Sequence, residues 1–151
     1  MQQDEDATMA AWWSYRREIV DPAVAANLGR IVKLTGDGFL VEFSSVASAV
    51  AAAVRIQAEI AQRLIGVPVQ ERVEFRIGIN LGDILKDDKD IYGDGVNLAA
   101  RIEALAEPGG IWVSSSVYEQ VRNRNEFALE DAGLHNVNTI SQPVQTWRVK
   151  M

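Results

Sequence analysis

A short glycine-rich segment with one carboxylate is the first part of the sequence that could do chemistry. The run Lys-Leu-Thr-Gly-Asp-Gly occupies residues 33–38, and Asp37 stands between Gly36 and Gly38. A carboxylate at a tight hairpin tip can hold a hard cation such as Mg²⁺, which takes oxygen ligands and often only one or two protein carboxylates. Glycines allow the backbone to approach a ligand closely. The same residues, taken alone, also fit a plain Asp-Gly turn that closes a hairpin.

A second segment, Asp90–Arg101, combines an amide and a guanidinium. Asn97 and Arg101 are four residues apart, so on a helix they share one face and can reach the same ligand. Such a pair is suited to a phosphoryl group on which negative charge develops. Taken alone, these residues also fit an exposed arginine and an asparagine that caps or solvates a helix start.

The bulk composition limits the classes of protein to which the chain can belong. The 151 residues fit a single domain, 1–151, with an N-terminal helical region at 1–28 and a core at 29–151. About half of the residues are apolar, there is no cysteine, and the formal charge is −6. An acidic chain is poorly suited to bind nucleic acid, because phosphate backbones require clustered Lys and Arg. No apolar run is long enough for a membrane segment and the N-terminus is acidic, so we expect a cytoplasmic protein.

The periodicity of apolar residues predicts an alternation of helices and hairpins. Pro22 predicts a kink in the first helix, and Gly29 predicts the end of that helix. Ser44 and Ser45 predict the N-terminal cap of the second helix. Helices are expected at 8–27, 44–64, 94–106 and 114–122, and strands at 30–35, 39–43, 72–80, 83–86, 111–113, 127–131 and 144–149. This order predicts an α+β sandwich of the ferredoxin-like split βαβ type, with helices packed on an antiparallel sheet. Because the chain opens on a helix, the first and central strand of that plan is absent.

Four segments, in order and at matching spacing, resemble the catalytic domain of class III adenylyl and guanylyl cyclases. They are Gly29–Phe43, Phe75–Asp83, Asp90–Arg101 and Ala106–Ile111. The agreement of four ordered motifs is far more specific than any lone glycine motif. The resemblance extends from Gly29 to the C-terminus and implies the class III cyclase fold.

The resemblance also implies roles for individual residues. Asp37 is similar to one of the two aspartates that hold Mg²⁺ or Mn²⁺, with Gly36 beside it at the substrate. Lys33 and Asp90 resemble the pair that reads adenine, where guanylyl cyclases typically carry Glu and Cys-type residues. The implied reaction converts ATP to 3′,5′-cyclic AMP and pyrophosphate.

In the same family pattern, Asn97 would orient the ribose and Arg101 would stabilise the transition state at the α-phosphate. Family members act as dimers with sites at the interface. One protomer supplies the metal aspartates, and the other supplies the base-reading pair with Asn and Arg. This chain carries both kinds of residue, so the resemblance implies a homodimer with two equivalent composite sites.

Two departures from the family pattern lower the activity that we expect. The family's first strand, with the second metal aspartate, would fall before Met1, so only one carboxylate ligand of the two-ion site is present and the chain corresponds to a truncated domain. Asn138 stands where many members carry a phosphate-binding lysine, and asparagine brings no charge. The domain is therefore expected to be weakly active or inactive as written.

Two other interpretations compete with an adenylyl cyclase domain. A catalytically silent cyclase-like module that binds nucleotide or dimerises for regulation would keep the same fold. A palm domain similar to diguanylate cyclases is disfavoured, because Gly36–Phe39 only echoes the Gly-Gly-Asp/Glu-Glu-Phe hairpin of that family.

Overall fold

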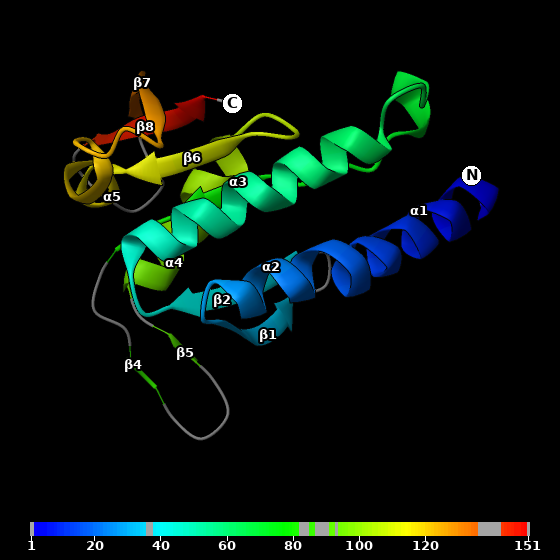
Figure 1. The fold of residues 1–151 in the computed structure, drawn as a ribbon, viewed down its shortest axis with the longest axis horizontal. Coiled ribbons are helices and arrows are strands. Elements are labelled where there is room, and N and C mark those ends of the chain that lie inside the picture. The colour runs from blue at the N-terminus through cyan, green and yellow to red at the C-terminus, as the bar shows by residue number, and fades with distance from the viewer. Residues whose placement is uncertain are drawn as a thin grey trace.

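The computed structural model describes two layers of helices around strands that run along the length of the molecule (Figure 1). It describes the backbone of residues 2–35, 38–81, 85–86, 91–92, 94–135 and 143–150, and the side chains of 9–32, 38–81, 95–135 and 143–150. Within these residues the fold is α+β, as the sequence predicts.

The N-terminal helical region is a helix in three parts. These are α1 (Gln2–Tyr15), a π-helical turn η1 (Arg16–Val20) and α2 (Asp21–Ala26). Pro22 lies in the first turn of α2, where its lack of an N–H is tolerated, and the irregularity that we expected there is the π-helical turn just before it. Gly29 does not end the helix as predicted: Leu28 adopts the left-handed conformation, with φ of 60°.

The next element is a hairpin of β1 (Gly29–Thr35) and β2 (Gly38–Phe43). The two strands are antiparallel from Gly29 opposite Phe43 to Thr35 opposite Gly38, with an irregularity between Ile31 and Lys33. A side-chain Cβ at position 29 would lie 2.4 Å from the Phe43 ring, so glycine is required there by close packing. The hairpin predicted around residues 36–38 is confirmed by this register.

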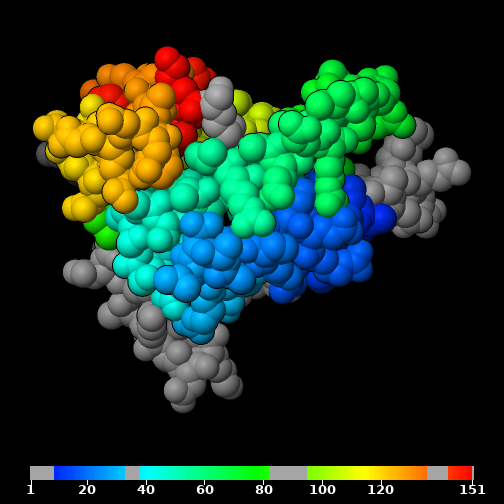
Figure 2. All heavy atoms as spheres, viewed as in Figure 1, coloured from blue at the N-terminus to red at the C-terminus, as the bar shows by residue number. Residues whose placement is uncertain are grey.

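Helix α3 (Val46–Arg63) connects the hairpin to the rest of the sheet. Its predicted N-cap is confirmed, because Ser45 Oγ accepts a hydrogen bond from the Ser48 N–H at 3.1 Å. Figure 2 shows α3 lying alongside the N-terminal helices on one face of the molecule. At this contact Arg63 donates to Glu18 at 2.7 Å, and that hydrogen bond holds the pKa of Glu18 below its usual range.

A four-stranded sheet follows, in the order β3-β6-β8-β7. Its strands are β3 (Ile77–Ile79), β6 (Ile111–Ser114), β7 (Ala128–His135) and β8 (Val144–Lys150). β3 and β6 are parallel, whereas β6, β8 and β7 are antiparallel neighbours. The remaining elements are η2 (Val69–Glu71), β4 (Leu85–Lys86), β5 (Ile91–Tyr92), α4 (Asp94–Leu105) and α5 (Ser115–Val121).

One predicted strand is much shorter than expected. The alternation over 72–80 predicts nine residues, but only Ile77–Ile79 pair as a strand. Phe75 is instead held by residues distant in the sequence, since its carbonyl accepts from the Gly109 N–H at 2.8 Å and from Gln57 Nε2 at 2.9 Å. The apolar alternation reports which side chains face the core, whereas strand pairing also needs a neighbouring strand.

The apolar core consists of two clusters. The first joins the N-terminal helices to α3 and includes Tyr15, Ile19 and Ile60, and the second joins α3 to β6, β8 and α5. Ile77 of β3 packs against both clusters. Tyr15 is 5% exposed, and burial raises the pKa of its phenol. The two clusters together place β2 and β3 on the same side of α3.

Candidate active site

Helix α4 carries the two predicted site residues whose side chains the structure describes. Asn97 is exposed and Arg101 is half-buried, and their spacing places them on one face of α4. Ile102, the next residue along the helix, is fully buried and anchors α4 in the core. Asn97 and Arg101 therefore project from a helix whose position is fixed by the core.

A close backbone contact seats α4 on the sheet. A Cβ at position 78 would lie 2.4 Å from the backbone nitrogen of Glu103 and 2.6 Å from the carbonyl oxygen of Ala99. Only glycine allows β3 and α4 to approach this closely. Gly78 therefore determines the distance between the sheet and the helix that carries Arg101.

Hydrogen bonds from the end of β3 hold the first turn of α4. Asn80 Nδ2 donates to the carbonyl oxygen of Gly95 at 3.1 Å. Ser116, at the start of α5, donates to the Leu81 carbonyl at 3.1 Å, and its hydroxyl also lies 3.3 Å from the Asn80 Oδ1. The turn of α4 that precedes Asn97 is thus tied to both β3 and α5.

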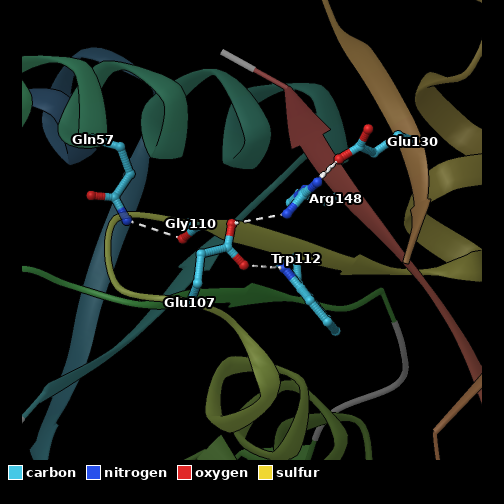
Figure 3. Close-up of polar contacts among 6 residues, drawn as sticks. All are labelled: Gln57, Glu107, Gly110, Trp112, Glu130 and Arg148. Atoms are coloured by element: carbon cyan, nitrogen blue, oxygen red, sulfur yellow. Dashed lines mark hydrogen bonds and ion pairs between the residues drawn. The ribbon is translucent and has the colours of Figure 1, made fainter. Parts of the chain in front are cut away.

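A polar network supports the segment that leads from α4 to β6 (Figure 3). Glu107 accepts from the Trp112 indole N–H at 2.8 Å and lies 3.6 Å from Arg148, which also pairs with Glu130 across β7 and β8. On the other side of the segment, Gln57 Nε2 donates to the carbonyl of Gly110 at 3.0 Å and to that of Phe75 at 2.9 Å.

These positioning residues were not among the predicted site residues. For Gln57 a signal existed, since it falls at the helical spacing of Val50, Ala53 and Ile60 on the apolar side of α3. A buried glutamine at such a position needs hydrogen-bond partners. The Glu107 network depends on cross-strand register, which the sequence pattern alone does not define.

We predict that Gln57→Ala will destabilise the protein by about 1–2 kcal/mol, because the Phe75 and Gly110 carbonyls would each lose one of their two donors and keep only a backbone N–H. The free energy of unfolding, measured by urea denaturation, tests this. Gln62→Ala is the matched control, since Gln62 is exposed on the same helix and its loss is expected to change stability by less than about 0.5 kcal/mol. Equal effects of the two substitutions would show that the Gln57 hydrogen bonds contribute nothing.

The other predicted site residues lie at or beyond the edges of the described part. The backbone of Lys33 lies in β1 opposite Leu40, but its side chain is outside the described residues. Gly36, Asp37, Asp90 and Asn138 are also outside them. The strand residues on either side of them are described. Thr35 pairs with Gly38, on either side of Gly36 and Asp37. Lys86 pairs with Ile91, which directly follows Asp90.

Arg101 has a buried side-chain donor without a partner in the described part of the chain, as Trp12 and Trp147 also have. Its Nη1 atom is buried and has no hydrogen-bond partner among the described residues. Leaving a guanidinium N–H buried without an acceptor is unfavourable, so such an atom indicates a ligand or partner that supplies one. The natural complement of this group is an anionic oxygen, such as that of a phosphate.

The donors available to a metal ion are few. In the described ranges no three His, Cys, Asp or Glu side chains come together as a group that could hold a metal ion. Asp37 is the only predicted metal ligand, and it lies outside those ranges. A two-ion centre needs more carboxylate oxygens than Asp37 offers. The residues that the structure describes therefore hold no complete two-ion centre.

The comparison with known families identifies the class of protein. Residues 17–151 match the family model of the adenylate and guanylate cyclase catalytic domain, so the chain belongs to this family. It is 42% identical over 147 residues to "Putative adenylate cyclase 3" of Rhizobium meliloti (strain 1021), covering 97% of this chain and 25% of that protein. It is 32% identical over 112 residues to an "Adenylate cyclase" of Streptomyces coelicolor, covering 72% of this chain and 27% of that protein. The chain thus spans about a quarter of the length of these relatives.

Solved structures confirm the fold. The crystal structure of an adenylate/guanylate cyclase/hydrolase from Silicibacter pomeroyi superposes with a TM-score of 0.88 at 44% identity, covering 93% of this chain and 83% of that one. An adenylyl cyclase from P. aeruginosa, at 24% identity, superposes with a TM-score of 0.78 over 100% of this chain and 84% of that one. Across the described part of the chain, no helix combines the length and the apolar character that crossing a membrane requires.

Proposed function

We propose that this domain is the catalytic domain of an adenylate cyclase. We also propose that residues 1–151 alone convert ATP to cyclic AMP slowly. The reaction is intramolecular: the 3′-oxygen of ATP loses its proton and forms a bond to the α-phosphorus. The bond from that phosphorus to the bridging oxygen of the β-phosphate breaks, and pyrophosphate leaves. The observation that carries the proposal is the buried, unpartnered Nη1 of Arg101 on the same helical face as Asn97, among the residues that the structure describes.

Each residue of the proposed site has a role that follows from its chemistry. Arg101 supplies N–H donors to the oxygens of the α-phosphate as their charge grows, and Asn97 holds the ribose so that the 3′-oxygen faces the phosphorus. Lys33 donates to a ring nitrogen of adenine, and Asp90 accepts from its exocyclic amine. Asn138 donates a neutral hydrogen bond to the triphosphate.

The cation enters this proposal together with ATP. Mg²⁺ or Mn²⁺ bound to the phosphates would supply charge neutralisation, with Asp37 and Gly36 beside it as the chain's contribution. The slow turnover that we propose follows from the single carboxylate and from the absence of a positive charge at Asn138.

The proposed site is composite in a homodimer. Asp37 follows β1 on the hairpin, whereas Asn97 and Arg101 lie on α4. A two-fold dimer that brings the hairpin of one protomer to α4 of the other forms two equivalent sites. In this arrangement, the phosphates of a nucleotide bound at the interface would lie beside the Arg101 guanidinium.

The base preference gives a test of the substrate. Replacing Lys33→Glu together with Asp90→Cys reverses the donor and acceptor pattern, so we predict that the ratio of GTP to ATP turnover will rise by about 10²-fold or more. The measurement is the formation of cyclic GMP and cyclic AMP with Mn²⁺ as the cation. An unchanged ratio would contradict the assignment of these two residues to the base.

A silent regulatory module is the second candidate function. Its supporting observation is that no metal-binding group of three His, Cys, Asp or Glu side chains occurs within the described ranges. The same assay separates the two candidates, since a silent module binds ATP without forming cyclic AMP above the level of an Arg101→Ala variant.

A further inference from the structure

Leu28, directly after the N-terminal helices, combines high exposure with a strained backbone. Its side chain is 79% exposed, more than that of any other large apolar residue that the structure describes. Its φ is 60°, and no other non-glycine residue in the described ranges has a positive φ. Glycine or asparagine is common at this position after a helix, because a bulky side chain is unfavourable there. Such a residue does not serve the stability of its own chain, and backbone strain of this kind is often retained for a function.

A surface hollow lies beside Leu28. It has a volume of about 440 Å³, and Asn27, the neighbour of Leu28, is part of its lining. The floor of the hollow is apolar and comes from α3 and the segment before β7; its residues are Ala47, Ala51, Val54 and Phe127. Figure 2 shows α3 between α2 and the segment 122–127 on one face of the molecule. All four floor residues are only half-buried, so they retain apolar surface that a partner could cover.

The charged residues around the hollow balance one another. Arg124 Nε lies 3.1 Å from Glu126 Oε1, and both residues line the hollow. Arg55 also lines it, and its Nε lies 3.3 Å from Glu59 Oε2. A strongly acidic or strongly basic partner would find no excess of opposite charge here, so electrostatics do not favour it. A partner face that carries the same balanced mixture of charges does fit, and the face of a second copy of this chain has that mixture.

The projecting leucine and the hollow make this face complementary to itself. When two identical surfaces meet about a two-fold axis, every contact between two residues occurs twice, once in each direction. Leu28 of each copy can then enter the hollow of the other copy, whose volume exceeds that of one leucine side chain. A single exposed leucine is ordinary on a protein surface. A strained leucine beside an apolar hollow that can receive it is a pair that a second copy covers completely.

We propose that Leu28 and the hollow beside it, which together we call the Leu28 face, form a two-fold surface on which a second copy of this chain docks. The proposal goes beyond the proposed function, since none of the residues assigned to ATP lines the hollow. The composite site uses the hairpin and α4, so the Leu28 face would join two such dimers. The contact is small, and a weak, transient association with a micromolar Kd is expected.

Sedimentation equilibrium of the purified chain, from low to several hundred micromolar, tests the association. Leu28→Asn removes the apolar side chain and introduces a residue that tolerates a positive φ, so the fold should be kept. We expect this variant to associate at least about tenfold more weakly than the unsubstituted chain. Ile65→Asn is the matched control, because Ile65 is 76% exposed and does not line the hollow. It should associate normally, and circular dichroism checks that both variants fold.

The expected change in mass does not depend on the composite site. If the composite dimer forms, Leu28→Asn changes the largest species from a tetramer to a dimer. If it does not form, the same substitution changes the largest species from a dimer to a monomer. In both cases the limiting mass falls by half, so a failure of the proposed function would leave this result intact.

Single-cysteine variants test which surfaces meet. The chain has no cysteine, so Leu28→Cys and Ala51→Cys each carry one thiol. An equimolar mixture of the two proteins under copper-catalysed air oxidation is expected to form a mixed disulfide, because position 28 of one copy lies in the hollow of the other. Ile65→Cys mixed with Ala51→Cys is the control pair and should form this product only at the background rate.

Three results would overturn the proposal. The first is that the unsubstituted chain and Leu28→Asn have the same mass at every concentration. The second is that Leu28→Asn and Ile65→Asn weaken association equally, which would show non-specific apolar contact. The third is that the mixed disulfide forms no faster than in the control pair. None of these readouts uses cyclase activity.

Discussion

Arg101→Ala is expected to lower the rate of cyclic AMP formation by about 10²–10³-fold, the loss that follows removal of a donor to a developing oxyanion. The Nη1 atom of Arg101 is buried without a partner among the described residues, so its N–H is available to an anionic oxygen. The loss should fall on kcat rather than on KM, because the charge on the α-phosphate oxygens is greatest in the transition state. Radiochemical detection of cyclic AMP from Mn-ATP measures both.

Two further substitutions make this prediction specific. Arg101→Lys keeps the charge but not the planar fork of donors, so we expect an intermediate loss. Arg122→Ala removes an exposed arginine after α5 and should leave the rate unchanged. If Arg101→Ala retained the full rate, Arg101 would be a structural residue.

The largest expected effect on stability comes from Gly78→Ala. A Cβ at this position would lie within 2.6 Å of two backbone atoms of α4, and backbone cannot move aside as a flexible side chain can. We expect a loss of about 3 kcal/mol in the free energy of unfolding, at the upper end for overpacking. Because the displaced helix carries Asn97 and Arg101, affinity for a nucleotide should also fall.

Gly66→Ala is the control for the general effect of replacing a glycine. Gly66 has a φ of +82°, and no atom lies within 4 Å of the place that a Cβ would take, so its substitution is expected to cost about 1–2 kcal/mol from backbone strain alone. Urea denaturation of both variants and titration with a fluorescent ATP analogue make the comparison. A Gly78→Ala protein as stable as Gly66→Ala would contradict the tight seating of α4.

Local rules of sequence reading worked best where the determinants are local. The hairpin around Gly38 and the cap at Ser45 depend on a few adjacent residues, and the structure confirms both. The α+β class also followed from periodicity, since each helix turns one apolar stripe toward the strands.

Local sequence patterns do not predict structure correctly where it depends on packing between residues distant in the sequence. Gly29 was assigned to the end of a helix, but it is required by the Phe43 ring across the hairpin, while Leu28 adopts the left-handed conformation. Residues 72–76 have the alternation of a strand but lack a partner strand among the described residues. Pairing depends on a neighbour, and no pattern within the segment reports whether that neighbour is present.

The candidate site was only partly accessible to sequence reasoning. The spacing of Asn97 and Arg101 placed them on one helical face, which α4 confirms. The residues that hold α4 in place, Gly78 and Asn80, act through close approach and through a hydrogen bond to a distant carbonyl. Neither contact has a signature in the local pattern.

The central claim, a composite adenylate cyclase site, is tested most directly by mixing two inactive variants. Asp37→Ala and Arg101→Ala each damage both sites of their own homodimer. A mixed dimer regains one intact site of two, and random pairing makes half of the dimers mixed, so about a quarter of the unsubstituted rate should return. The measurement is cyclic AMP formation from Mn-ATP by each variant and by their equimolar mixture. Recovery to about that level is the predicted result, and a mixture no more active than its components would contradict a composite site.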